Sequence, residues 1–219
     1  MSRTPFFMTE VKICGLSTPE TLSAALDEGA AYVGAVIFPK SPRHIEPEVA
    51  AAMFEAARGR ASIVAVVVNP DDALLDRIAT HLKPDFIQLH GSETTERAKQ
   101  VRHQTGAKII KALSIREPAD FVDVPVWTST ADILLFDAKP PAGSALPGGV
   151  GHSFDWSLMA NRQFGAKWFL AGGINPANLG EALRMTRAPM VDVSSGVERA
   201  PGVKDITLIR EFMQAARRS

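Results

Sequence analysis

Residues 168–197 (WFLAGGINPANLGEALRMTRAPMVDVSSGV) contain two short apolar runs separated by one amphipathic segment. The runs are 168–173 and 190–197. Neither shows strict alternation of apolar and polar residues, and such near-continuous apolar character is typical of strands that are covered on both faces. The segment 176–185 predicts a helix that begins at Pro176, because proline is favoured in the first helical turn. This stretch therefore predicts one strand–helix–strand unit of a parallel sheet.

The same unit recurs along the chain. Expected strands begin at residues 11, 32, 62, 86, 107, 133, 168 and 190. Amphipathic segments lie between them at residues 18–28, 46–58, 71–82, 94–104, 117–130, 176–185 and, after the last strand, 205–217. The weakest predicted helix is 117–130, because Pro118 and Pro125 shorten or break it.

Strict alternation of eight strands with helices predicts a parallel sheet with right-handed connections. Eight such units fit a single (β/α)₈ TIM barrel, an α/β fold in which helices ring a closed eight-stranded barrel, and one domain over residues 1–219. An open doubly wound sheet is the alternative. Its first strand would be followed by a GxGxxG fingerprint, whereas residues 14–16 read CGL.

The composition limits the possible partners. The formal net charge is zero and the isoelectric point is near 7.0, which argues against binding to nucleic acid or to anionic lipid. No apolar run approaches the ~20 residues of a membrane span, and the N-terminal apolar patch is too short for a signal peptide. One cysteine cannot form an internal disulfide. We expect a soluble cytoplasmic protein with no nucleic-acid or membrane partner.

Polar residues gather where the expected strands end. In a barrel of this type the active site is built at the C-terminal ends of the strands. Those ends supply Cys14, the loop to Arg43, His90, Ser114, Asp137, Gly172 with Gly173, and residues 192–196. Alternation along each strand places Lys12 with Cys14, and Asp192 with Ser194, on common faces.

Two of these ends predict a phosphate site. Gly172 and Gly173 follow the seventh strand, and Ser194, Ser195 and Gly196 follow the eighth. Glycine lets backbone N–H groups approach an anion, and the loops after strands seven and eight hold phosphate in many barrels. Either loop alone is equally well explained as a tight turn. The two together favour phosphate.

Asp137 and Cys14 form a candidate acid and base for moving protons across a sugar. Lys12 is expected to favour the thiolate that a basic cysteine requires. A lone cysteine is nevertheless more often an inert core residue, and an aspartate at a strand end is often a helix cap. Asp137 precedes a loop, residues 139–152 (KPPAGSALPGGVGH), of a length typical of lids, and a helix is expected to start at 153–156.

Arg43 follows a turn and can grip a carboxylate with two parallel hydrogen bonds, although loop arginines are usually solvated. His90 is either a rim histidine of the barrel or a catalytic group. No HExxH, CxxC or carboxylate-rich loop predicts a metal site. A Walker loop and a GxSxG elbow are also missing from the sequence.

The motifs in order resemble the phosphoribosylanthranilate isomerase family over almost the whole chain. They are KICG (12–15), SPR (41–43), QLHG (88–91), LLFD (134–137), GGVG (148–151) with FDW (154–156), LAGG (170–173), DVSSGVE (192–198), PG (201–202) and KD (204–205). One departure is Val150, where the family pattern leads us to expect Ser or Thr.

The resemblance implies an Amadori rearrangement of N-(5-phosphoribosyl)anthranilate to 1-(2-carboxyphenylamino)-1-deoxyribulose 5-phosphate in tryptophan biosynthesis. By this resemblance Asp137 is the acid, Cys14 the base, and Arg43 the ligand of the anthranilate carboxylate. His90 and Asp192 are expected to contact the substrate. Residues 172–173 and 194–196 would hold the phosphate, and 139–152 would close over the site. No cofactor or metal is implied, and the chain is expected to be a monomer or a homodimer.

Three alternatives share parts of this pattern. A ribulose-phosphate epimerase would need a metal-binding set of His and Asp. An indole-glycerol-phosphate synthase would need a catalytic lysine in the barrel, for which Lys12 and Lys111 are candidates. A catalytically silent phosphate binder would not need both Cys14 and Asp137, and turnover of fresh substrate distinguishes it.

Overall fold

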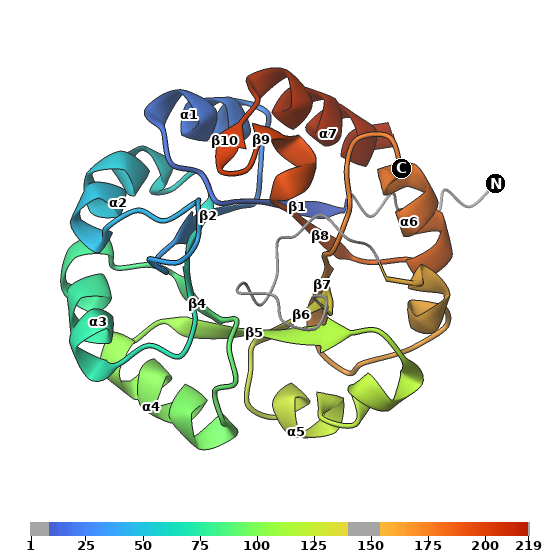
Figure 1. Ribbon diagram of the computed structural model, residues 1–219, viewed down its shortest axis with the longest axis horizontal. Helices are drawn as coiled ribbons and strands as arrows, with labels where there is room; N and C mark the ends of the chain where they lie inside the picture. Colours follow the sequence, from blue (N-terminus) through green and yellow to red (C-terminus); the bar gives the residue numbers. More distant parts are fainter. Residues whose placement is uncertain (1–8, 140–153, 219) are drawn as a thin grey trace.

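The computed structural model describes residues 9–139 and 154–218. In these residues, eight parallel strands close into a barrel in the order of the chain (Figure 1). They are β1 (Glu10–Cys14), β2 (Tyr32–Val36), β3 (Ser62–Val67), β4 (Phe86–Leu89), β5 (Lys108–Ile115), β6 (Ile133–Ala138), β7 (Lys167–Leu170) and β8 (Met190–Val193). The predicted TIM barrel is confirmed, and every expected strand start lies within one residue of the observed one. That residues 1–219 form one domain stays a prediction.

Helices surround the barrel on its outside (Figure 1). They are α1 (Pro19–Asp27), α2 (Pro47–Phe54), α3 (Asp72–Arg77), α4 (Thr95–Thr105), α5 (Val124–Thr128), α6 (Leu179–Thr186) and α7 (Ile206–Arg218). Short helical turns extend or separate them at η1 (Glu55–Ala57), η2 (Ile78–Leu82), η3 (Pro118–Phe121), η4 (Trp156–Met159) and η5 (Ser195–Val197). Thr18 and Thr94 cap α1 and α4, because each side-chain oxygen accepts from a backbone N–H of the first turn.

Two helix starts differ from the prediction. The helix expected at 153–156 is, in the described residues, only the 3₁₀ turn η4, which Asp155 caps at the N–H of Ser157. The helix expected from Pro176 begins at Leu179. Its start is delayed because the side chains of Asn175 and Asn178 accept hydrogen bonds from nearby backbone N–H groups and form a turn instead.

Alternation along the strands divides the buried side chains between two cores. In β6, Ile133 and Leu135 face the barrel interior, whereas Leu134 and Phe136 face the layer between barrel and helices. Inside, Tyr32 meets Phe86 and Phe169 edge to face, with ring centroids 5.6 and 5.1 Å apart. These aromatic rings fill the barrel, so it is a packed core and only its end is open to chemistry.

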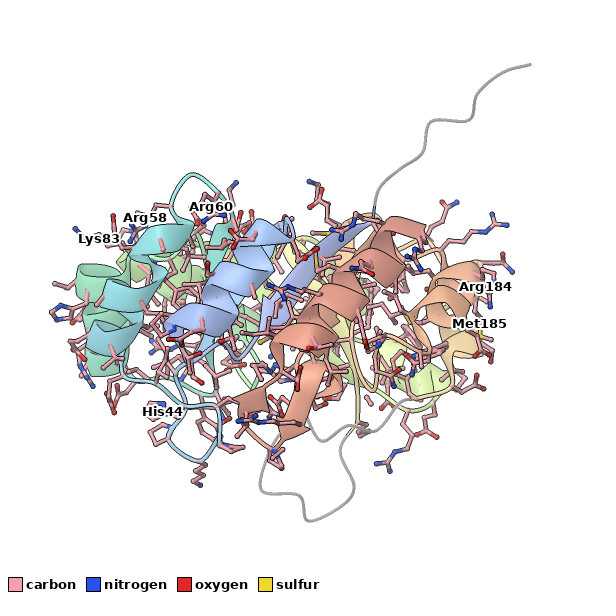
Figure 2. The ribbon with its side chains drawn as sticks, turned by 90° about the horizontal axis from the view of Figure 1, so that it is seen from above. His44, Arg58, Arg60, Lys83, Arg184 and Met185 are labelled. Atoms are coloured by element: carbon pink, nitrogen blue, oxygen red, sulfur yellow. The ribbon has the colours of Figure 1, made fainter. Side chains whose placement is uncertain are left out.

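The C-terminal ends of the strands lie together at one end of the barrel. His44, in the loop after β2, lies at this end, and Arg58, Arg60 and Lys83, which precede strands, lie at the opposite end (Figure 2). A small antiparallel hairpin of β9 (Glu198–Ala200) and β10 (Val203–Lys204) follows β8 at the same end as His44 (Figure 2). The hairpin adds charged side chains to the rim of the barrel.

Candidate active site

Four consecutive strands of the closed barrel carry most of the predicted site. In ring order they are β6, β7, β8 and β1, because β8 pairs with β1. Asp137 belongs to β6 and Cys14 to β1, while the two glycine-containing loops follow β7 and β8. The candidate acid and base therefore flank the candidate phosphate loops.

Cys14 points into the barrel mouth and is buried. A Cβ on Gly34 would lie 3.1 Å from the Cys14 sulfur, so glycine makes room for the thiol. Burial raises the pKa of Cys14, and the opposing effect of Lys12 and Lys204 does not outweigh it. Lys12 acts in the direction expected from the sequence, because it lowers the pKa of the thiol, but burial outweighs this effect.

Lys12 lies inside the barrel beside Cys14 and is fully buried. Its ammonium donates to Asp192 Oδ1 at 2.9 Å. Burial alone would lower the pKa of Lys12, but Asp192 and Cys14 outweigh burial and the pKa is raised. Lys12 therefore stays charged, and Asp192 is placed next to Cys14 as the partner of this lysine.

Asp137 is the last residue but one of β6, and its carboxylate is buried at the mouth. Its Oδ1 accepts from the N–H of Ala138 at 2.8 Å, and its Oδ2 lies 3.3 Å from His90 Nε2. Gly172 lies against this carboxylate at a φ of +82°, where a Cβ would be 2.6 Å from the Ala138 nitrogen. The β7 loop thus needs glycine to pass beside the candidate acid.

His90 follows β4 and contacts both Asp137 and Gln88. Its Nδ1 lies 3.0 Å from Gln88 Nε2, so in the tautomer in which Nδ1 accepts, Nε2 carries the proton on the Asp137 side. Nε2 is buried and makes no hydrogen bond within the described part of the chain. The same is true of Gln88 Oε1. These two atoms are buried polar groups that a ligand in the barrel mouth could satisfy.

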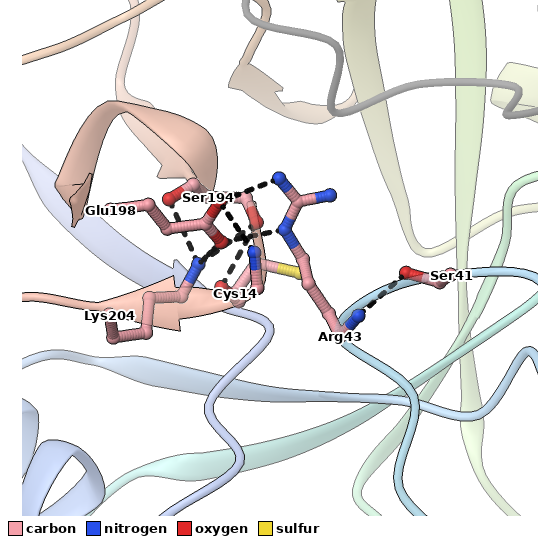
Figure 3. Close-up of polar contacts among 7 residues, drawn as sticks. Cys14, Ser41, Arg43, Ser194, Glu198 and Lys204 are labelled. Carbon is pink, nitrogen blue, oxygen red and sulfur yellow. Dashed lines mark hydrogen bonds and ion pairs between the residues drawn. The ribbon is translucent and has the colours of Figure 1, made fainter. Parts of the chain in front are cut away.

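Arg43 holds a carboxylate of its own chain. Its Nε and Nη2 donate to the two carboxylate oxygens of Glu198 at 2.7 and 2.8 Å (Figure 3). Lys204 donates to the same carboxylate and also to the carbonyl oxygen of Ser194 at 2.9 Å. Arg43 thus binds a carboxylate with two hydrogen bonds, as the sequence predicts, but this carboxylate belongs to Glu198 of the same chain.

The two predicted phosphate loops touch each other. The Cα of Gly196 packs on the carbonyl of Ile174, where no Cβ would fit, and Gly173 has a φ of +68°. Within the described residues, no hydrogen bond runs from the N–H groups of Gly172, Gly173, Ser195 and Gly196 to another group. These donors lie on loops and on the turn η5, because α6 begins further along. The sequence predicted a helix that starts at Pro176, directly after the β7 loop, but α6 starts only at Leu179, so no N-terminus of a full helix lies at these donors.

The comparisons with known proteins decide the family. The family model described as N-(5'phosphoribosyl)anthranilate (PRA) isomerase matches residues 11–215. The chain is 51% identical over 209 residues to the N-(5'-phosphoribosyl)anthranilate isomerase of Caulobacter vibrioides, covering 95% of each chain. It belongs to this isomerase family.

Solved phosphoribosylanthranilate isomerases share the fold. The enzyme from Thermotoga maritima superposes with a TM-score of 0.86 at 32% identity, covering 97% of this chain and 100% of that one. A second structure, with a TM-score of 0.83 at 31% identity and the same coverage, is a complex with reduced 1-(o-carboxyphenylamino)-1-deoxyribulose 5-phosphate. Another structure shows monomers generated from the dimeric Thermotoga maritima enzyme. It has a TM-score of 0.82 at 31% identity and covers 97% of this chain and 100% of that one.

Some residues of this isomerase chain escaped the sequence reasoning. Glu198 and Lys204 stand inside quoted motifs, but no role was predicted for either. The contact of Glu198 with Arg43 joins segments far apart in sequence, and Lys204 reaches this pair through Glu198. Gln88 was quoted only as part of the motif QLHG (88–91), without a role. Ser114, next to the last residue of β5, is half-buried and pairs in register with Asp137, but its side chain makes no hydrogen bond within the described residues.

Three other observations concern the expected lid, metal binding and membrane spans. From residue 140 onward, the expected lid 139–152 lies outside the described residues, and so does Val150. Among the described residues, no group of three or more His, Cys, Asp and Glu side chains is arranged to hold a metal ion. No helix in the described ranges is long and apolar enough to cross a membrane.

Proposed function

We propose that this chain catalyses the Amadori rearrangement of N-(5'-phosphoribosyl)anthranilate, with Asp137 as the acid and Cys14 as the base. The observation that carries the proposal is the order of groups around the barrel. Acid, glycine loop, glycine loop and base follow one another on β6, β7, β8 and β1. A phosphate held between the two loops would bring the attached sugar between the two proton carriers.

In the first step, the protonated carboxyl of Asp137 gives its proton to the furanose ring oxygen. The bond from this oxygen to C1 breaks, and the nitrogen lone pair forms a protonated Schiff base. Asp137 must hold a proton for this step, and its Oδ2 lies 3.3 Å from His90 Nε2 at the barrel mouth. Ring opening leaves the substrate nitrogen with a positive charge.

In the second step, the Cys14 thiolate removes the proton from C2, and the electrons of the C–H bond form the enolamine and neutralise the nitrogen. The free thiol is protonated because burial raises the pKa of Cys14. The positive charge of the Schiff base would lower that pKa again, so that the thiol loses its proton to water and the thiolate forms once the ring is open. Tautomerisation then moves a proton from the C2 hydroxyl to C1 and gives the ketone.

Binding of the two anionic ends falls to different groups. Arg43 is proposed to hold the anthranilate carboxylate, and the N–H groups of residues 172–173 and 194–196 the phosphate. His90 and Asp192 are proposed to contact the sugar. Residues 139–152 are proposed to close over the opened intermediate, which water would otherwise hydrolyse.

The alternative enzymes receive less support. Lys111 of β5 pairs in register with Leu134 on the outer face of the sheet and contacts Glu93 and Trp127, so it cannot serve a synthase inside the barrel. Lys12 does face inward, but Asp192 holds it. The described residues also hold no metal-binding cluster of the kind an epimerase needs.

The decisive experiment is a turnover assay with freshly prepared substrate. Consumption of phosphoribosylanthranilate is monitored as the loss of its fluorescence. We expect consumption by the purified protein without added metal or cofactor. Binding of the substrate without turnover would support a silent binder and overturn the proposal. The protein is further proposed to act in the cytoplasm as a monomer or a homodimer, which light scattering after size exclusion would distinguish.

A further inference from the structure

Three buried charged side chains form one cluster beside Cys14. Arg43, Glu198 and Lys204 have side chains that are 7%, 4% and 1% exposed (Figure 3). They come from the loop after β2 and from the hairpin of β9 and β10, whose register pairs Lys204 with Glu198. Arg43 and Lys204 both bond to the one carboxylate of Glu198, and burial lowers the pKa of Lys204.

Glu198 lies at the centre of this cluster. Its two oxygens take the Nε and Nη2 donors of Arg43, and the same oxygens accept from Lys204 and from the N–H of Gly202. Burial acts to raise the pKa of Glu198, but Arg43 and Lys204 outweigh it and the pKa is lowered. Glu198 is therefore ionised at neutral pH and able to hold both cations.

The surroundings leave the arginine little freedom. A Cβ on Gly15 would lie 2.7 Å from Arg43 Cδ, and Gly202, at a φ of +80°, packs against the carbonyl of Pro42. Because a guanidinium is planar, two parallel bonds to Glu198 fix its plane and the direction of its remaining N–H bonds. A long side chain that is fixed in advance loses less conformational entropy when a ligand binds.

Lys204 links the same carboxylate to the phosphate loop. Its ammonium donates to the carbonyl oxygen of Ser194 at 2.9 Å and to Ser194 Oγ at 3.2 Å. The Ser194 hydroxyl in turn donates to the carbonyl of Cys14 at 3.2 Å. One network thus joins Arg43, the start of residues 194–196 and the strand that carries Cys14.

We propose that Glu198 is a positioning residue, which fixes Arg43 for the carboxylate end of the substrate and, through Lys204, sets that arginine at a constant distance from the phosphate loop. The inference rests on the proposed function. Glu198 itself touches no reacting atom in this scheme. Its effect is to determine how strongly the site distinguishes ligands that carry the carboxylate from those that do not.

The test compares two phosphorylated ligands in wild type and in Glu198→Gln. One is reduced 1-(o-carboxyphenylamino)-1-deoxyribulose 5-phosphate, and the other is its phenylamino counterpart, which lacks the carboxylate. Calorimetry should show that Glu198→Gln weakens binding of the first roughly tenfold to a hundredfold, the scale of one charge-assisted hydrogen bond. Binding of the second should change only a few-fold. A residue with a merely structural role would weaken both equally.

Glu93→Gln is the matched control, because Glu93 also forms a buried pair with a lysine, Lys111, at 2.8 Å. It should leave the ratio of the two affinities at the wild-type value. Glu198→Asp serves if the Gln variant does not fold, since it keeps the charge and shortens the side chain. Positioning predicts a reduced ratio for Glu198→Asp as well.

An unchanged ratio in a folded Glu198 variant would overturn the proposal. That result differs from failure of the proposed function, in which the wild-type protein would neither turn over the substrate nor prefer the ligand with the carboxylate.

Discussion

Burial and charge act in opposite directions on Cys14. The barrel mouth removes water from the thiol, which raises its pKa, while Lys12 and Lys204 attract the thiolate without reversing the shift. As the proposed base, Cys14 would stay protonated until a positive charge develops on the substrate. The arrangement protects a reactive sulfur in the free protein, because the thiolate and not the thiol is the nucleophile.

The role of Cys14 can be tested by substitution and by alkylation. Cys14→Ser should fold but lose nearly all turnover, because a serine hydroxyl is far too weak an acid to form an alkoxide at neutral pH. Iodoacetamide should place one label on the chain and inactivate it, with reduced product analogue giving protection. Because the pKa is raised, the labelling rate at neutral pH should be below that of free cysteine and should continue to rise above the ordinary thiol pKa. Full activity of a protein whose Cys14 is shown by mass spectrometry to be alkylated would remove it as the base.

Asp137 should be essential for its proton and dispensable for the fold. Asp137→Asn keeps the size of the side chain but cannot protonate the ring oxygen, so kcat should fall by about 10²–10⁴-fold. Asp132, just before the same strand, offers a control because its carboxylate accepts from the N–H of Ile109 at the opposite end of the barrel. Asp132→Asn should change stability and leave kcat near wild type. Turnover of Asp137→Asn within a few-fold of wild type would exclude Asp137 as the acid.

At the scale of elements, the site depends on two loops whose backbones approach other groups closely. Gly172 passes beside Asp137 and Ala138, and Gly196 packs on Ile174, so neither position has room for a side chain. If these loops hold phosphate, as proposed, backbone N–H groups rather than side chains would supply the contacts at these glycines. Phosphate binding should follow the backbone more than the serine hydroxyls.

Gly173→Val and Gly165→Val form a matched pair, because both glycines have a φ of +68°. Valine is strained at either position, but a Cβ on Gly165 would meet only Thr128, at 3.8 Å, outside the site. Gly173→Val should raise KM by about tenfold or more for each hydrogen bond to phosphate that is lost. Gly165→Val should lower the melting temperature and leave KM nearly unchanged, and Ser195→Ala should cost about 0.5–1.5 kcal/mol. Equal affinity for phosphorylated and dephosphorylated ligands would show that the loops are only turns.

At the scale of the whole molecule, the sequence predicts what depends on local pattern. Apolar runs give the strands and their positions in the barrel, since each strand pairs with the next one along the chain. The start of α6 was missed because two asparagine side chains compete with the helix for backbone N–H groups. The pair of Arg43 with Glu198 could not be predicted, because 155 residues separate them and no local signal joins them. The net pKa of Cys14 also depends on burial, which a motif does not report.

Closure of the barrel brings together the two ends of the chain. The first strand pairs with the eighth, and Lys12 of β1 contacts Asp192 of β8 across 180 residues of sequence. The pair lies inside the barrel, where both charges have lost their water. Such a pair adds little net stability in comparison with apolar residues, but removing one partner leaves a buried charge without compensation.

Lys12→Met should therefore lower the free energy of unfolding by about 3–5 kcal/mol, measured by chemical denaturation. The double variant Lys12→Met with Asp192→Leu should recover most of this loss, because no buried charge is then left alone. Arg60→Met is the control, since the pair of Arg60 with Asp27 is 2.8 Å long, against 2.9 Å for Lys12 with Asp192, but exposed. It should change stability far less. If Lys12→Met were no more destabilising than Arg60→Met, the seam between β1 and β8 would not depend on this pair. If the double variant were less stable than the single one, Asp192 would stabilise the closed barrel by contacts other than its bond to Lys12.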